Sequence, residues 1–97
     1  MTDFIQARVA DLESRTVGDQ LILLDLRSQT YLSLNRTGAE LWPLMVEGVE
    51  RQRLVQALQE RHDVAAPVAE GDVDALLRQL RDADLLQQTG TSAAADA

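Results

Sequence analysis

The sequence predicts an α+β domain in which a small three-stranded antiparallel sheet is followed by three α-helices. Two observations carry this prediction. Short aliphatic segments in the first third of the chain alternate with polar residues or run continuously, which is typical of strands. In the rest of the chain, apolar residues recur at i, i+3, i+4 and i+7, which is typical of helices packed on one face. A length of 97 residues suits one domain with one modest core.

The strands are expected before residue 35. A weak strand lies within residues 8–17, and Gly18 then favours a turn. The aliphatic segment LILLDL reads as a buried strand, and YLSL alternates with period two after the polar connection RSQT. Two strands joined by so short a loop form an antiparallel hairpin. The second of them is predicted to be an edge strand, whose unpaired main chain is an aggregation hazard unless something pairs with it.

The helices follow the hairpin. The first is expected to be capped by Asn35 or Thr37 and to end at Gly48, with Pro43 disturbing its course. The second is expected over ERQRLVQALQERH, and the third over VAEGDVDALLRQLRDADLL. The apolar stripe of the third helix consists of Val73, Leu76, Leu77 and Leu80. Strands followed by helices that cover one face of the sheet indicate a winged-helix type of α+β domain.

The two ends of the chain lack an apolar pattern. Residues 1–7 are expected to be flexible, residues 8–86 to form the domain, and residues 87–97 to be a disordered tail. No apolar run is long enough to span a membrane, and the first residues do not resemble a secretion signal. A cytoplasmic location is therefore expected.

Composition excludes several functions. The net charge is -7 and every basic residue other than His62 is an arginine, which argues against nucleic-acid and anionic membrane surfaces. The absence of cysteine removes disulfides and thiolate chemistry. His62 is the only histidine and is expected at the surface of a helix end, without partners for catalysis. No metal-binding or phosphate-binding motif is present, so neither an enzyme nor a cofactor is expected.

The segment LLDLRSQTYLSLNRTGAELW resembles the PqqD-like family, named for coenzyme PQQ synthesis protein D. Members have an aspartate-containing strand, a polar turn, an aromatic-containing strand ending in Leu-Asn, and then Thr-Gly and a helix with Trp. The matching residues are Asp25, Tyr31, Leu34, Asn35, Thr37, Gly38 and Trp42. The resemblance extends over residues 8–86. Two departures from the family pattern are Pro43 inside the first helix and Asp84, where the family often has glycine.

The resemblance implies a RiPP recognition element, which binds the leader of a ribosomally synthesised precursor peptide. In this family the leader is added as a strand to the third strand and is gripped by the third helix. The peptide-binding residues implied here are Thr30, Tyr31, Leu32, Ser33 and Leu34 of the strand and Val73, Asp74, Leu77, Arg78, Leu80 and Arg81 of the helix. Leu77 and Tyr31 are expected to hold apolar leader side chains. An aspartate at Leu77 is accordingly expected to weaken leader binding and to leave the fold largely intact.

A separate domain of this kind looks most like the leader-binding protein of lasso-peptide clusters, a non-catalytic adaptor that delivers the precursor to a leader peptidase. A chaperone for a radical-SAM peptide-modifying enzyme remains an alternative. A winged-helix DNA-binding regulator is a further one, but it would need clustered basic residues that the third helix lacks. Pairing of two copies through the edge strand or the helices also stays open.

Overall fold

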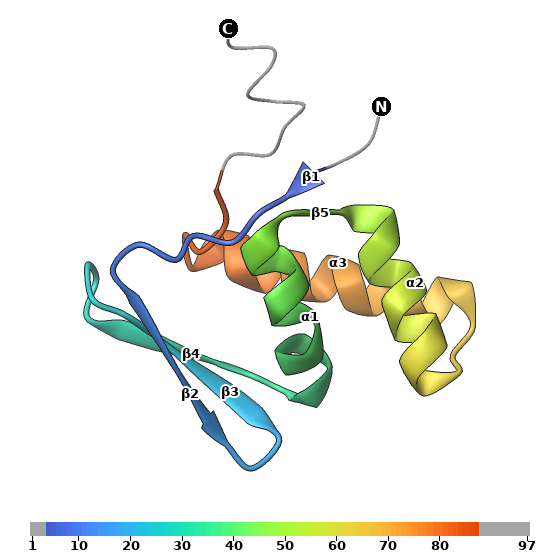
Figure 1. The fold of residues 1–97 in the computed structure, drawn as a ribbon, viewed down its shortest axis with the longest axis horizontal. Coiled ribbons are helices and arrows are strands. Elements are labelled where there is room, and N and C mark those ends of the chain that lie inside the picture. The colour runs from blue at the N-terminus through green and yellow to red at the C-terminus, as the bar shows by residue number, and fades with distance from the viewer. Residues whose placement is uncertain (1–3, 88–97) are drawn as a thin grey trace, which may run out of the picture.

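The computed structural model describes residues 4–87, and its centre is a three-stranded antiparallel sheet (Figure 1). The strands are β2 (Leu12–Val17), β3 (Gln20–Asp25) and β4 (Thr30–Leu34), in the spatial order β2-β3-β4. This arrangement leaves β4 at an edge, as the sequence predicts. The α+β prediction of a small antiparallel sheet followed by three helices is confirmed.

The three helices are α1 (Arg36–Glu47), α2 (Arg51–His62) and α3 (Ala66–Asp82). Asn35 caps α1, because its side-chain oxygen accepts a hydrogen bond from the Gly38 N–H at 2.9 Å. The helix continues through Pro43 and ends at Gly48, whose φ of 98° suits glycine.

The end of α3 explains one departure from the family pattern. Asp84 follows the helix with a φ of 60°, in the left-handed region that glycine prefers and aspartate tolerates. The chain then turns back, with the Leu85 N–H donating to the Leu80 carbonyl at 2.9 Å. Asp84 therefore fills a position where glycine has the same backbone role.

The sheet has one buried and one open face. The register pairs Leu23 with Leu32 and Leu21 with Leu34, so these side chains share the face that the helices cover. The alternate residues Leu24 and Tyr31 lie on the other face and are exposed. The core thus lies between one side of the sheet and the apolar faces of the helices.

Residues 4–7 pack on the domain, although the sequence predicts residues 1–7 to be flexible; for residues 1–3 this stays a prediction. The two-residue strand β1 (Phe4–Ile5) pairs with β5 (Val49–Glu50) after α1, and Ile5 is buried. Ala7 forms a β-bridge with Leu86 at the other end of the domain. Because a single isoleucine and a single alanine form no periodic apolar pattern, this contact could not be predicted from the sequence. Residues 1–3 and 88–97, including most of the predicted tail, lie outside the described residues.

Arg8 and Asp25 form an ion pair at the junction of this segment with the hairpin. The Arg8 Nη2 donates to Asp25 Oδ2 at 2.7 Å, and both side chains are buried. Arg8 also donates to the carbonyls of Ala10 and Asp84. The main chain of Arg8 bonds to Leu85 instead of to the sheet and Asp11 has a left-handed φ of 57°, so the predicted strand from residue 8 starts only at Leu12.

Candidate functional site

The outer edge of β4 presents unpaired main-chain groups. Across the hairpin, the Asp25 carbonyl accepts from the Gln29 N–H at 2.8 Å, which places the main-chain groups of Asp25 on the β4 side of β3. Antiparallel partners alternate between bonded and non-bonded pairs. Thr30, Leu32 and Leu34 therefore turn their N–H and C=O groups toward β3. Tyr31 and Ser33 turn theirs outward, away from the sheet.

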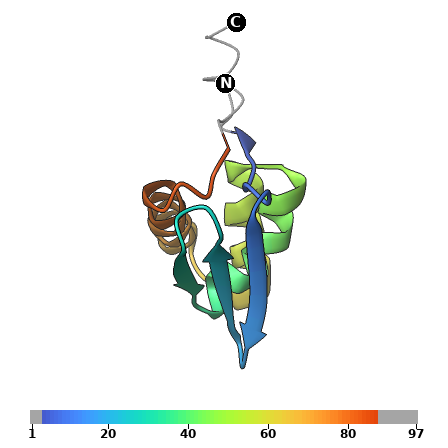
Figure 2. The ribbon, with the colours of Figure 1, turned by 90° about the vertical axis from the view of Figure 1, so that its left-hand side faces the viewer.

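Helix α3 runs beside this edge (Figure 2). The contact is made by Gln79, whose Nε2 donates to the outward carbonyl of Ser33 at 3.4 Å. A bond of this length is weak and solvent-exposed, so it can be exchanged for another partner. The rest of the strand edge has no helix residue bonded to it among residues 4–87.

Two hollows mark the ends of a groove between β4 and α3, called here the edge groove. The polar-end hollow has a volume of about 170 Å³ and is lined by Asn35, Thr37, Gly38, Asp72, Ala75, Leu76 and Gln79. The apolar-end hollow has a volume of about 40 Å³ and is lined by Leu23, Asp25, Thr30, Tyr31, Leu32, Ala83 and Leu85. Gln79 contacts the strand between them. The two hollows thus lie near the two ends of β4, the polar-end one just past the strand at the start of α1, and α3 runs antiparallel to the strand.

The two ends of the edge groove differ in charge. The hydrogen bond from Arg8 holds the pKa of Asp25 below its ordinary value, so this carboxylate is anionic but neutralised by its partner. Asp72, at the polar end, is exposed, and its side chain forms no ion pair or hydrogen bond with another residue among 4–87. The uncompensated charge of the groove lies at its polar end.

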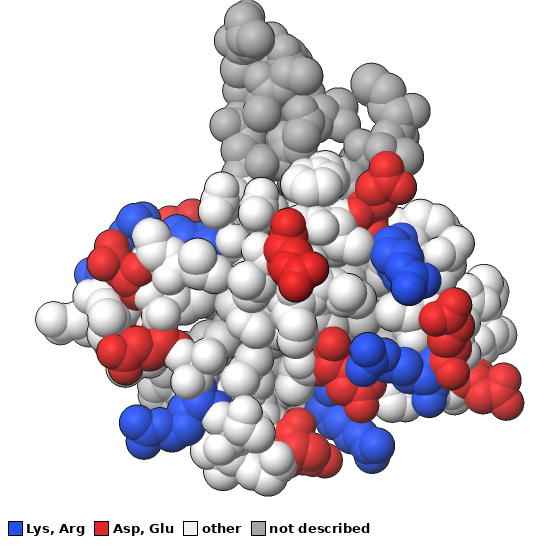
Figure 3. Space-filling view, viewed as in Figure 1, with Lys and Arg blue, Asp and Glu red and all other residues white. Residues whose placement is uncertain are grey.

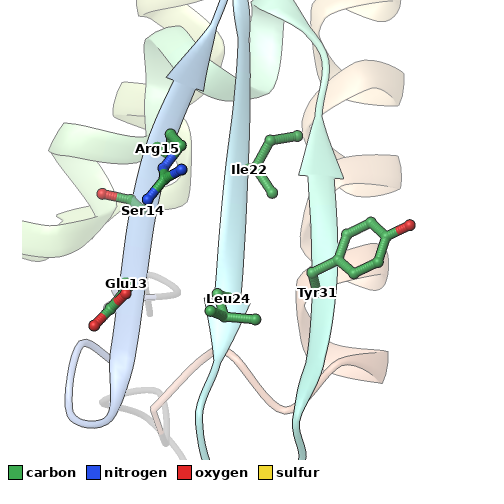
Figure 4. Close-up of a pocket in the computed structure, with 6 residues that line it drawn as sticks. All are labelled: Glu13, Ser14, Arg15, Ile22, Leu24 and Tyr31. Carbon is green, nitrogen blue, oxygen red and sulfur yellow. The ribbon is translucent and has the colours of Figure 1, made fainter.

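The structure places the predicted strand residues at the edge. Thr30, Tyr31 and Ser33 are exposed, Leu32 is partly buried, and Leu34 is buried in the core. Tyr31 is 73 % exposed, so its ring does not pack under a loop of the domain. Figure 4 shows its ring pointing away from β3 and past the β4 edge.

The predicted helix residues lie elsewhere on α3 than the wall of the groove. Val73, Leu77 and Leu80 are buried in the core, with Leu77 only 4 % exposed. Asp74 pairs with Arg51 of α2 at 2.7 Å. Arg78 and Arg81 are exposed and line neither hollow. The structure therefore places none of these six residues at the two hollows, and their contact with a leader stays a prediction.

The wall that faces β4 consists of Asp72, Ala75, Leu76, Gln79 and, just past the helix, Ala83. Sequence reasoning assigned none of them to it, because Leu76 was placed in the apolar stripe and the other four side chains, which are small or polar, give no hydropathy signal. Their spacing of three or four residues does place them on one flank of the apolar stripe. This spacing was the only feature of the sequence from which the wall of the groove could have been predicted.

The open face of the sheet carries a third, shallow hollow of about 420 Å³ (Figure 4). It is lined by Glu13, Ser14, Arg15, Ile22, Leu24 and Tyr31. Tyr31 joins this face to the edge groove, because it borders both hollows.

The described part of the chain offers little for catalysis. The His62 Nε2–H donates to the Glu40 carboxylate at 2.7 Å, which links α2 to α1. Among residues 4–87, no group of three His, Cys, Asp or Glu side chains could hold a metal ion.

None of the helices described is long and apolar enough to cross a membrane. On the face shown in Figure 3, arginines and acidic side chains are interspersed rather than gathered by sign.

The fold and the groove define a winged-helix type of domain with a free strand edge beside its last helix. Residues 20–86 match the family described as Coenzyme PQQ synthesis protein D (PqqD). The chain therefore belongs to the PqqD family.

Two solved structures are similar to the chain. One is described as TbiB1 in complex with the TbiA(beta) leader peptide; it shares 29% identity with a TM-score of 0.74, over 84% of this chain and 94% of that one. The other is lasso peptide synthetase B1 complexed with the leader peptide, with 26% identity and a TM-score of 0.73, over 88% and 98%. No curated protein matches the sequence significantly.

Proposed function

We propose that this protein is a RiPP recognition element of lasso-peptide biosynthesis, a non-catalytic adaptor that binds the leader of a precursor peptide in the edge groove. The observation that carries the proposal is the outward main chain of Tyr31 and Ser33 beside α3. Both similar structures are complexes with leader peptides, and they match the chain over nearly their whole length.

The leader would bind as a fourth strand. The main-chain groups of Tyr31 and Ser33 supply the hydrogen bonds of an added strand, and side-chain pockets supply specificity. The Ser33 carbonyl would exchange its weak bond from Gln79 for a bond from the leader. The small hollow beside Leu32 and Ala83 suits an apolar side chain of the leader. Tyr31 lies where its ring can cover the added strand.

The residues of α3 would then have two roles: some would touch the leader, and others would support the wall from the core. Leu76, Gln79 and Ala83 would touch the leader directly, since they line the hollows. Val73, Leu77 and Leu80 would support this wall from the core. Arg78 and Arg81 would meet only a leader, or a partner protein, that extends beyond the groove.

The partners of the complex follow from this role. The adaptor would present the bound leader to a separate leader peptidase in the cytoplasm, where a ribosomal precursor is made. A second copy that paired through β4 would occupy the same main-chain groups as the leader. Self-association through this edge and leader binding would therefore compete.

The proposal is tested by fluorescence polarisation with the labelled leader of the precursor peptide encoded beside this protein. We expect saturable binding with one leader per chain. A scrambled leader of the same composition is the matched control and should bind far more weakly, because its side chains no longer fit the hollows. Equal binding of both peptides, or of neither, contradicts the proposal.

A further inference from the structure

The two ends of the edge groove differ in chemistry. At one end, Leu23, Leu32, Ala83 and Leu85 make an apolar hollow, and the one carboxylate there is neutralised by Arg8. At the other end, the hollow is larger and mostly polar. A peptide that lies along β4 meets both ends at once, so the groove distinguishes one end of the peptide from the other.

The polar end is rich in hydrogen-bond acceptors. It contains the carboxylate of Asp72, the hydroxyl of Thr37 and the amide oxygen of Gln79. The Gln79 amide nitrogen donates to the Ser33 carbonyl in the peptide-free structure, and once the leader takes over that carbonyl the amide is free to turn its oxygen toward a donor of the leader. No arginine lines this hollow, although the described chain has arginines on every helix.

The start of α1 also lies at this end, and its positive partial charge has to be weighed against Asp72. The Asn35 side chain already accepts from the Gly38 N–H at 2.9 Å and so satisfies part of this helix end. A helix end carries about half an elementary charge. The carboxylate of Asp72 carries a full one, so the acceptor character prevails.

We infer that the polar end of the edge groove binds a lysine or arginine side chain of the leader. This inference rests on the proposed function and adds to it the chemistry of a second anchor. The basic group donates to Asp72 and to the neutral oxygens of Thr37 and Gln79, while its aliphatic stem lies on Leu76. The net charge of -7 also attracts a basic segment at long range.

The geometry fixes the spacing of this anchor within the leader. Thr30 borders the apolar-end hollow and Asn35 the polar-end hollow. Because both hollows lie on the α3 side of β4 and the side chains of an added strand alternate between its two faces, the basic residue lies an even number of positions, about four, from the apolar residue that fills the other hollow.

A charge-reversal cycle tests the inference. Each Lys or Arg of the leader is changed singly to Glu, and each peptide is titrated against the wild-type protein and against Asp72→Lys. We expect one leader position, about four residues from an apolar anchor and on the same face of the leader strand, at which the Glu variant binds the wild type roughly tenfold more weakly. Asp72→Lys should restore much of that loss for this peptide alone.

Neutralisation gives a matched control. Asp72→Asn should weaken binding of the native leader about three- to fivefold and reduce its dependence on salt. Glu70→Gln removes the same charge from the same helix, but two residues correspond to about 200° around the helix axis. Glu70 is exposed and lines neither hollow, so its variant should bind the leader nearly as the wild type does.

The outcomes separate the inference from the function on which it rests. If the wild type binds the leader but no basic position couples to Asp72, the inference is overturned and the proposed function stands. Tight binding of a leader without Lys or Arg, or equal effects of Asp72→Asn and Glu70→Gln, also overturns it. If the wild type does not bind the leader, the proposed function fails first.

Discussion

Leu77 and Gln79 are separated by one residue on α3 and have different surroundings. Leu77 is buried in the core, whereas Gln79 is exposed and contacts the main chain of Ser33. Two residues correspond to about 200° around a helix, so Leu77 and Gln79 lie on opposite sides of α3, whereas Leu76 is buried and also lines the polar-end hollow. The exposed wall residue Gln79 can therefore be exchanged without repacking the core, and Leu76 cannot.

Replacement of Leu77 by aspartate should unfold the protein rather than act selectively on the groove. A buried carboxylate without a partner adds a desolvation cost to the lost apolar contacts, so we expect a loss of about 3 kcal/mol or more in the free energy of unfolding. Urea denaturation followed by circular dichroism measures it. Arg78→Asp, one residue further and exposed, is the control and should unfold near the wild-type midpoint. A folded Leu77→Asp variant that had lost only leader binding would restore the original assignment.

Asp25 should make stability depend on pH in the acidic range. Its hydrogen bond with Arg8 lowers the pKa of the folded-state carboxyl below the ordinary value of 3.8. The unfolded chain therefore binds the proton first as the pH falls, and the stabilisation present above pH 3.8 is lost progressively below it. Asp25→Asn should be less stable than the wild type at pH 7.

The measurement is the urea midpoint of both proteins at pH 7, 4 and 3. The difference between wild type and Asp25→Asn should shrink as the pH falls below 3.8. Asp11→Asn serves as a control, because Asp11 pairs with Arg27 in a far more exposed setting. A constant difference between the two proteins across this range would show that the ion pair contributes nothing that depends on pH.

At the scale of elements, the hairpin was predictable and the wall of the groove was not. Period-two alternation in YLSL fixes which residues of β4 face the core, and the short polar loop fixes its pairing. For α3, the stripe through Val73, Leu76, Leu77 and Leu80 correctly predicts a helix, and all four are buried. Which flank of this stripe faces β4 depends on how the helices pack, and that information lies in distant residues such as Ile5 and Arg8.

The free edge of β4 gives an element-scale prediction. Ser33→Pro removes an outward N–H that makes no bond within the sheet, so the fold should tolerate it while leader binding falls sharply. Ser14→Pro is the matched control on the opposite edge: its register partner Leu23 turns its main chain toward β4, so the Ser14 N–H also faces outward. Fluorescence polarisation should show near-normal leader affinity for Ser14→Pro. Equal losses in both variants would argue against addition of the leader to β4.

At the scale of the whole molecule, the N-terminal segment closes the domain. Besides the β1–β5 pair, the Arg8 N–H donates to the Leu85 carbonyl and the Gln87 N–H donates to the Gln6 carbonyl, both at 2.8 Å. These bonds join the first and last described residues of the chain. They also hold the end of α3, and with it the apolar end of the edge groove.

Ile5→Ala should therefore destabilise the protein although the residue lies near the chain end. Removal of its buried side chain should lower the free energy of unfolding by about 2–3 kcal/mol, at the lower side of the usual range because a short segment can relax. Thermal or urea unfolding measures the change. Val9→Ala, at a half-exposed position nearby, should cost less than about 0.5 kcal/mol. An unchanged midpoint for Ile5→Ala would contradict the packing of this segment.

The hydrogen bond between Gln6 and Gln87 also brings the two ends of the domain together, at the opposite end of the sheet from the turn at Gly18 (Figure 1). The first and last described segments of the domain are thus adjacent in space. A circularly permuted chain, with a short linker between its present ends and new termini at that turn, would keep β4, α3 and the groove between them. For the same reason, the domain can be inserted into a loop of a host protein as a module with its binding edge unobstructed.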